Sequence, residues 1–445
     1  MKIVLLSPKG PLYRHRNGIF GKALRYAPLT LTTLAALIPE DLKAEVAIHD
    51  EGIAEIPLDL TADLIGITAI TGTAKRAYEL AAHFRGRDIA VVLGGPHVTL
   101  VPDEAARHAD AIVTGYAEET WPRLLRDFQA GSLRPVYRQS PDLQLTGLPF
   151  PRRELLDPRQ YLTLNVFETS RSCAHACEFC VAPTAWGRRP YLKPVERVVE
   201  DIARLRARKL IFVDLNLISH KEHARALFEA LIPLKVQWFG LSTTLIGKDP
   251  ELMDLMAASG CHGLLLGFET ISAGGLRETH KRFNDPDEYR AVIEALHRRA
   301  ISIMGCFVFG LDDDDPGVFE RTARFVIETG IDLPRFALVT PFPGTPLHAR
   351  LKAEGRLLTE DWELYDGQHV VFRPARMSAR ELQEGHERAW KTTYGYAAIA
   401  RRLARSRTRT RVAIPANLGY RFYAYNLHRF YNCDWYLGPA AAGTA

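Results

Sequence analysis

Short apolar runs alternate with amphipathic stretches along most of the chain. Five runs in the N-terminal third have the length and composition of buried strands: residues 1–8, 44–52, 62–71, 89–99 and 109–120. Apolar positions at helical spacing lie between some of them, in residues 29–38 and 74–86. Repeated strand and helix units of this kind predict a Rossmann-like, doubly wound parallel sheet, which binds ligands at the carboxyl ends of its strands.

A second series of strands and helices follows in the middle of the chain. The apolar runs are residues 209–218, 260–272, 301–315 and 335–347, and residues 286–300 are apolar at helical spacing. These repeats predict a second parallel sheet, open or closed into a partial (β/α) barrel of the TIM type. From about Leu351 onward the pattern indicates helices.

The chain is longer than one hydrophobic core usually allows, so we expect several domains in an α/β protein. It has 445 residues, and domains rarely exceed about 300. We assign residues 1–140 to the Rossmann-like domain, residues 141–165 to a proline-rich linker, residues 166–350 to the barrel and residues 351–445 to a helical C-terminal cap.

Composition and charge exclude little, but they place the chain among ordinary globular proteins. The net charge of +5 is too small to indicate a nucleic-acid partner by itself. No apolar run approaches the roughly 20 residues of a membrane span, and residues 1–8 do not resemble a secretion signal. Six cysteines in such a chain predict reduced thiols and a cytoplasmic location.

Half of these cysteines lie within eight residues, at Cys173, Cys177 and Cys180. Chance is a poor explanation, because the polar neighbours of these cysteines are not typical of a core. A structural zinc site normally has four protein ligands, and no fourth is evident nearby. An iron–sulfur cluster held by three thiolates explains the segment better, because three ligands leave one iron open for a substrate or cofactor.

This segment resembles the signature of the radical S-adenosylmethionine (SAM) enzymes. The pattern C-x-x-x-C-x-aromatic-C is formed by the three cysteines with Phe179. The resemblance implies a [4Fe–4S] cluster whose free iron chelates SAM and, when reduced, cleaves it to a 5′-deoxyadenosyl radical. It also implies that Phe179 packs near the adenine. Ser172 and Ala174 replace a glycine and a proline that many relatives carry.

Polar residues at the ends of the predicted barrel strands are candidates for SAM binding, although each could instead be a turn or cap residue. Glu269 is the strongest candidate, because a carboxylate after an apolar strand needs a partner. The resemblance implies that the Gly267-x-Glu269 strand end lies against SAM. The full candidate set is Phe179, Asp214, Asn216, Gly267, Glu269 and Thr340.

The N-terminal unit resembles the cobalamin-binding domain that precedes the barrel in a large subclass of radical SAM enzymes. The segments LGGPHVTLVPDEA and VTGYAEETWPRLL carry this likeness. The motif D-x-H-x-x-G, which supplies a cobalt ligand in other B12 proteins, is absent, and His97 can be read as a loop-capping residue. Candidate cobalamin-binding residues follow the predicted strands: Thr68, Thr71, Gly94, Gly95, Pro96, His97, Gly115 and Tyr116.

The C-terminal region resembles the tail of lipid-acting B12-dependent radical SAM proteins such as the hopanoid methylases. Six arginines lie between Arg401 and Arg411, and they are typical of a solvated helix end. Residues 418–437 interleave aromatics with arginine, which fits a core helix, a membrane-surface element or part of a substrate opening.

Taken together, these features predict a cobalamin-dependent radical SAM methyltransferase that methylates an unactivated carbon of a small molecule or lipid. A radical SAM dehydratase, cyclase or rearrangement enzyme that does not use cobalt is the alternative, and a nucleic-acid or membrane binder with a structural metal is a third hypothesis. The methyltransferase hypothesis requires an electron donor such as flavodoxin or ferredoxin. We expect no nucleic-acid partner, and membrane-surface contact could involve the C-terminal region.

Overall fold

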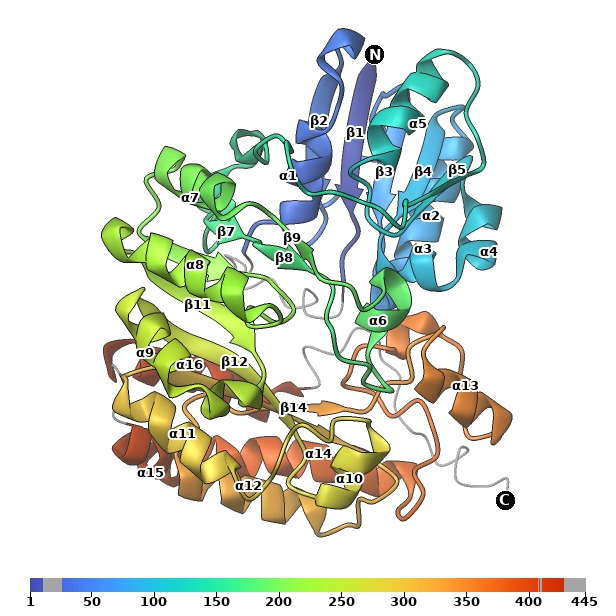
Figure 1. The fold of residues 1–445 in the computed structure, drawn as a ribbon. Helices are drawn as coiled ribbons and strands as arrows, with labels where there is room; N and C mark the ends of the chain where they lie inside the picture. Colours follow the sequence, from blue (N-terminus) through green and yellow to red (C-terminus); the bar gives the residue numbers. More distant parts are fainter. Residues whose placement is uncertain (11–25, 407, 409, 428–445) are drawn as a thin grey trace. The chain divides into compact units, whose positions relative to one another are not determined.

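The computed structural model describes residues 1–10, 26–406, 408 and 410–427 (Figure 1). They form two compact units. The first contains Met1–Ala174, Cys180–Ala207 and Phe342–Thr345, and the second contains His175–Phe179, Arg208–Pro341 and the chain from Pro346 onward.

The first unit is built on a six-stranded parallel sheet in the order β2-β1-β3-β4-β5-β6. Its strands are β1 (Lys2–Ser7), β2 (Glu45–Asp50), β3 (Leu64–Thr68), β4 (Ala90–Gly94), β5 (Ala111–Thr114) and β6 (Val136–Arg138). The first five confirm the predicted strands. Strand β6 was not predicted. The strand order reverses at β1, which is the topology of a doubly wound sheet.

Helices cover both faces of this sheet, so alternate strand residues enter two separate cores. On one face, α1 (Leu29–Ala36) and α5 (Thr120–Gln129) pack on β-strand residues such as Leu5 and Val113. On the other face, α2 (Ala74–Arg85) packs on residues such as Val4 and Val91. Burial on both faces explains why these strands are apolar along their whole length.

The remaining elements of this unit are α3 (Pro96–Leu100), α4 (Pro102–Ala105), β7 (Val166–Phe167), β8 (Ser170–Arg171), α6 (Val181–Trp186), β9 (Tyr191–Leu192) and α7 (Val195–Arg204).

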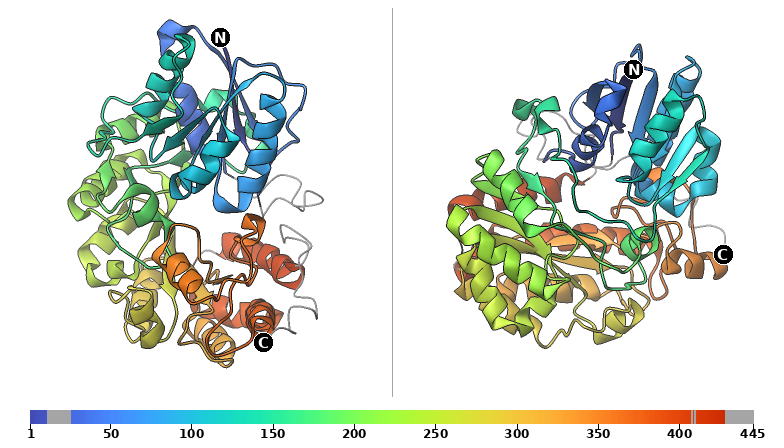
Figure 2. Two further views of the ribbon diagram at one scale, coloured as in Figure 1. Left: turned by 90° about the vertical axis from the view of Figure 1, so that its right-hand side faces the viewer. Right: turned by 45° about the horizontal axis from the view of Figure 1, so that its top comes forward.

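The second unit contains five parallel strands that neighbour one another in sequence order. They are β10 (Lys209–Phe212), β11 (Gln237–Ser242), β12 (Cys261–Glu269), β13 (Ser302–Phe309) and β14 (Arg335–Leu338). The intervening helices are α8 (Lys221–Leu231), α9 (Pro250–Ala258), α10 (Ala273–Glu278), α11 (Tyr289–Arg298) and α12 (Val318–Thr329), and Figures 1 and 2 show them along the outer face of the strands. This arrangement is the predicted partial (β/α) barrel. Strand β11 was not predicted.

Among its described residues, the C-terminal region adds four α-helices to the second unit: α13 (Pro346–Ala353), α14 (Ala379–Thr393), α15 (Tyr396–Ser406) and α16 (Thr410–Tyr425). The prediction of a solvated arginine run is wrong for Arg402, which is fully buried. Its guanidinium donates to the carbonyl oxygens of Ile331 and Asp332 and to Oδ1 of Asn417, so it fastens α15 and α16 to the barrel. Arg407, Arg409 and residues 428–437 lie outside the described part of the chain. Among the described helices, none combines the length and the apolar composition needed to cross a membrane.

Candidate functional site

The three clustered cysteines lie in the loop between β8 and α6. None of the three forms a disulfide, and all three are half-buried. Cys173 and Cys180 belong to the first compact unit and Cys177 to the second. Cys180 is also the N-cap residue of α6.

The other described cysteines differ from these three. Cys261 is buried in β12, and burial raises the pKa of its thiol well above the usual range. Burial also raises the pKa of Cys306, to about 11. Within the described residues no preassembled group of three metal-binding side chains occurs, and Cys433 lies outside them. The donor set fits an iron–sulfur cluster, because three thiols of one irregular loop, none of them in a disulfide, can all become thiolate ligands.

A buried ion-pair network holds the strand that leads into this loop. Arg171, at the end of β8, pairs with Glu118 and, at 2.6 Å, with Glu168. Lys193 also lies 2.9 Å from Glu168. Burial alone would raise the pKa of Glu168, but Arg171 and Lys193 lower it to about 2. The network therefore fixes the backbone two residues before the first cysteine.

Tyr116 holds the next residue of the same segment. Its hydroxyl oxygen accepts a hydrogen bond from the backbone N–H of Ser172 at 3.0 Å, and its ring stacks on Trp186 of α6 at 5.4 Å. Ser172 has a φ of 68°, in the left-handed region that favours glycine. Ser172 Oγ donates to the carbonyl oxygen of Gly187, which helps to hold this conformation.

The six predicted SAM-binding residues all belong to the second unit, five of them at the carboxyl ends of its strands. Asp214 and Asn216 follow β10, Gly267 and Glu269 end β12, and Thr340 follows β14. Asp214, Asn216, Glu269 and Thr340 are buried. Asn216 Oδ1 accepts the N–H of Ile218 at 3.3 Å, and Thr340 Oγ1 donates to the carbonyl oxygen of Leu338 at 3.1 Å, so both also have the local turn contacts that the sequence left open.

Glu269 has a partner that the sequence did not indicate. Its Oε1 pairs with Nζ of Lys281, which also donates to the carbonyl oxygen of Gly267 at 2.9 Å. A Cβ atom on Gly267 would lie 2.3 Å from Glu269 Oε1 and 2.7 Å from Lys281 Nζ. A larger residue at 267 would therefore displace the ends of the Glu269 and Lys281 side chains. Nothing in the spacing of Lys281 marks it as a site residue, because it follows α10 in an irregular segment.

The predicted cobalamin-binding residues cluster at the carboxyl ends of three neighbouring strands in the first unit. Thr68 ends β3, Gly94 ends β4, and Gly115 follows β5; the others lie in the segments just beyond. Gly95 has a φ of 103°, and a Cβ there would lie 2.7 Å from the carbonyl oxygen of Ala69. The loop after β4 thus needs glycine at this position.

His97 is completely buried, and both of its ring nitrogens are engaged. Nδ1 lies 3.3 Å from Thr71 Oγ1, and Nε2 lies 3.1 Å from the Tyr78 hydroxyl and 3.4 Å from Glu104 Oε1. Burial lowers the pKa of His97, although Glu104 opposes this effect. These contacts agree with the loop-capping interpretation. Either ring nitrogen of His97 would have to lose its contacts before it could ligate cobalt.

Three families of known proteins match consecutive parts of the chain. The radical SAM superfamily matches residues 167–326, and the B12 binding domain matches residues 25–125. A domain of unknown function (DUF4070) matches residues 345–440.

Individual relatives cover most of the chain. The bacteriochlorophyllide d C-12(1)-methyltransferase of Chlorobaculum tepidum is 30% identical over 388 residues, which are 84% of this chain and 84% of the relative. The hopanoid C-2 methylase of Rhodopseudomonas palustris is 28% identical over 354 residues, 75% of this chain and 66% of the relative.

Solved structures share the fold. The radical SAM methyltransferase TsrM from Kitasatospora setae, with cobalamin and a [4Fe–4S] cluster bound, aligns with a TM-score of 0.63 at 18% identity over 79% of this chain and 78% of that one. The cobalamin-dependent radical enzyme OxsB, with aqua-cobalamin and SAM bound, aligns with a TM-score of 0.67 at 12% identity over 86% of this chain and 65% of that one.

Proposed function

The chain belongs to the cobalamin-dependent radical SAM methyltransferases, and from this premise we propose that it methylates an unactivated carbon of a small molecule or lipid. The observation that carries the proposal is the match of a B12 binding domain and a radical SAM domain in one chain, together with 30% identity to a carbon methyltransferase over 84% of both proteins. A [4Fe–4S] cluster, SAM and cobalamin are the cofactors of this family. Members of the family need a reductant and a small-molecule substrate.

We assign the cofactors to the residues of this chain as follows. Cys173, Cys177 and Cys180 would ligate the cluster, because they are three clustered thiols of one loop and none of them forms a disulfide. Phe179, Asp214, Asn216, Gly267, Glu269 and Thr340 would contact SAM, and Thr68, Thr71, Gly94, Gly95, Pro96, His97, Gly115 and Tyr116 would form the cobalamin site. When bound, the reduced cluster with SAM supplies a 5′-deoxyadenosyl radical, and cobalamin carries the methyl group.

The residues of this chain would orient these groups and exclude water from them, since the cofactors carry the difficult chemistry. In this assignment residues 1–140 hold cobalamin, residues 141–165 link the domains, residues 166–350 hold the cluster and SAM, and residues 351–445 cap the barrel. Burial of the polar strand ends, with Glu269 and Asp214 among them, supports a site that is shielded from solvent.

The substrate class rests on the relatives. One is named for bacteriochlorophyllide d and another for a hopanoid. We therefore propose that the substrate of this chain is a mainly apolar small molecule or a lipid. Exposed apolar side chains on α16, such as Val412, Ile414 and Leu418, support contact with a membrane surface or an apolar substrate. A flavodoxin or ferredoxin would supply the electron, in a cytoplasmic setting.

Methyl-labelled SAM tests the proposal. The anaerobically reconstituted protein, given cobalamin, a reductant and an extract of apolar metabolites, should transfer the label to a product. It should also form 5′-deoxyadenosine and S-adenosylhomocysteine in comparable amounts, because one SAM is cleaved reductively and another donates its methyl group. Turnover that yields 5′-deoxyadenosine without S-adenosylhomocysteine or labelled product would exclude methyl transfer and favour a cobalt-independent dehydratase, cyclase or rearrangement enzyme.

A further inference from the structure

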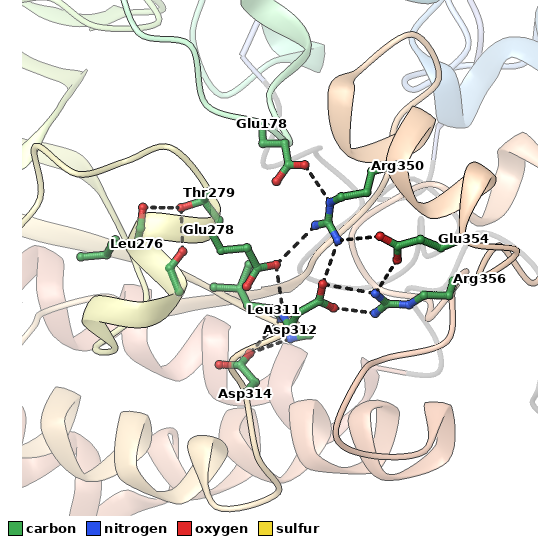
Figure 3. A network of polar contacts seen from close by, with 12 residues as sticks. Glu178, Leu276, Glu278, Thr279, Leu311, Asp312, Asp314, Arg350, Glu354 and Arg356 are labelled. Carbon is green, nitrogen blue, oxygen red and sulfur yellow. Dashed lines mark hydrogen bonds and ion pairs between the residues drawn. The ribbon is translucent and has the colours of Figure 1, made fainter.

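Glu178, which lies between the second and third clustered cysteines, is held at three points. Its backbone N–H donates to the carbonyl oxygen of Thr279 at 3.2 Å, and its carbonyl oxygen accepts from the N–H of Leu347 at 3.3 Å. Its side-chain Oε1 accepts from Nε of Arg350 at 2.9 Å. All four residues belong to the second compact unit, and Figure 3 shows the side chains of Glu178 and Arg350 pointing toward each other.

Arg350 is itself fixed by two acidic residues of the barrel (Figure 3). It lies on α13, and its Nη1 is 2.8 Å from Oδ2 of Asp312, in the loop after β13. Its Nη2 is 3.5 Å from Oε1 of Glu278, at the end of α10. Arg356 holds Asp312 from the other side, 2.5 Å from its Oδ1. These contacts with the barrel orient the guanidinium of Arg350 toward Glu178.

The side chains of this pair are partly shielded from solvent, which strengthens their interaction. The Glu178 side chain is 12% exposed and that of Arg350 is 29% exposed. The pair is charge-assisted, and contacts of this kind are about twice as strong as neutral hydrogen bonds. Partial burial lowers the pKa of Arg350, but the hydrogen bonds that its guanidinium donates to Glu178 and Asp312 outweigh this and raise it, so the guanidinium stays charged.

We propose that Arg350 is a positioning residue for the iron–sulfur cluster, which it serves by holding Glu178 and with it the loop that carries the cysteines. The proposal rests on the assignment of Cys173, Cys177 and Cys180 as the cluster ligands. It gives a role to the start of the C-terminal region, which matches a domain of unknown function. A loop fixed on both sides of Glu178 loses less conformational entropy when its cysteines bind iron.

The pair also places two fixed and opposite charges beside the ligand loop. Reduction adds an electron to the cluster, so a nearby negative charge opposes it and a nearby positive charge favours it. Removing the charge of Glu178 should thus raise the reduction potential, and removing that of Arg350 should lower it. A residue that served only the folding of the loop would shift neither potential in a charge-dependent direction.

The first measurement is the rate at which a ferrous chelator removes iron from the anaerobically reconstituted full chain. E178Q and R350Q should each release iron roughly ten times faster than the parent, the factor expected for one charge-assisted hydrogen bond. The double variant E178Q/R350Q should release it no faster than either single variant, because both remove the same contact. R356Q is the matched control: it removes an arginine of the same network that does not touch Glu178, and it should release iron at the parental rate.

The second measurement is the midpoint potential of the cluster, followed by electron paramagnetic resonance. E178Q should shift it upward and R350Q downward, each by up to a tenfold change in the reduction equilibrium, or about 59 mV for a one-electron couple. R350K keeps the charge and should retain the parental potential while releasing iron faster than the parent.

Parental iron release and potential in both E178Q and R350Q would overturn the proposal. So would equal loss of iron from R356Q and R350Q, which would mean that the network supports the fold generally. A parent chain that takes up no iron would overturn the cysteine assignment as well. Parental behaviour of the variants in a chain that binds iron would overturn the role of Arg350 alone, and neither measurement requires methyl transfer.

Discussion

Lys281 and Glu269 form an ion pair at the carboxyl end of β12, and both side chains are almost fully shielded from solvent. Their exposed fractions are 7% and 11%. Oε1 of Glu269 faces Lys281. Glu269 has a φ of 63°, at a register shift between β12 and β13. The ion pair thus holds the carboxylate in a fixed position at the strand end.

Glu269→Ala should weaken SAM binding while leaving the iron content unchanged. The loss of one charge-assisted hydrogen bond to SAM should cost about 1.5–3 kcal/mol of binding free energy. Isothermal calorimetry with the anaerobic reconstituted protein measures this affinity. Glu360→Ala is a suitable control, because Glu360 also pairs with a lysine, Lys352 at 2.8 Å, but on an exposed surface. Equal SAM affinity in the two variants would assign Glu269 a structural role only.

Lys281→Ala should lower the free energy of unfolding much more than a comparable change on the surface. It leaves the carboxylate of Glu269 buried without its counter-charge, which costs about 3–5 kcal/mol. Lys352→Ala breaks the exposed pair with Glu360 and should cost no more than about 1 kcal/mol. Urea unfolding of the metal-free chain, followed by circular dichroism, compares the two. Similar unfolding midpoints would show that the Glu269–Lys281 pair contributes little.

The sequence predicted the two parallel sheets because their strands are apolar on both faces. Strands such as β4 and β12 are buried between layers of the fold, and they consist mostly of apolar residues for this reason. Strand β6 was missed because it is only three residues long and lies at the edge of the sheet, within a proline-rich and polar stretch. Strand β11 was missed because its apolar run is short and interrupted by a glycine.

The contacts around the cysteine loop could not be predicted, because they join residues that are distant in sequence. Arg350 lies 172 positions after Glu178, and no local pattern marks either residue as a partner of the other. Tyr116 was predicted as a cobalamin-binding residue from its position after β5. Its contact with the backbone of Ser172, which is 56 residues away, was not predicted. Motif spacing identifies the ligand types, whereas the side chains that fix the loop emerge only from the fold.

Replacing Cys173, Cys177 and Cys180 together with alanine should abolish cluster assembly and the cleavage of SAM. Iron and sulfide analysis after anaerobic reconstitution measures assembly, and formation of 5′-deoxyadenosine measures cleavage. The double variant Cys261→Ala/Cys306→Ala should retain the cluster, because burial raises the pKa of both thiols and makes them poor thiolate ligands. Four irons per chain in the triple variant would refute the assignment of the cluster ligands.

Asp314 should make the stability of the protein depend on pH near neutrality. Its Oδ2 accepts the N–H groups of Gly310 at 2.9 Å and Leu311 at 3.1 Å, while Oδ1 is buried without a partner among the described residues. Burial raises the pKa of Asp314 from 3.8 to about 7, even though these two hydrogen bonds act to lower it. The folded state therefore binds a proton that the unfolded state releases near pH 4. The stabilisation is fully present below that pH, and it is lost as the pH rises through about 7.

Asp314→Asn should flatten this dependence, because asparagine keeps the acceptor oxygen and cannot ionise. Between pH 5 and pH 8 the free energy of unfolding of the parent should fall, relative to the variant, by on the order of 2–3 kcal/mol. Asp315→Asn is the control at the next position: a hydrogen bond from Arg321 lowers the pKa of Asp315, so this carboxylate does not titrate in that range. Urea unfolding at several pH values measures each slope. If Asp314→Asn kept the parental slope while Asp315→Asn changed it, the titrating group would not be Asp314, and the pH dependence would have to come from another buried acid.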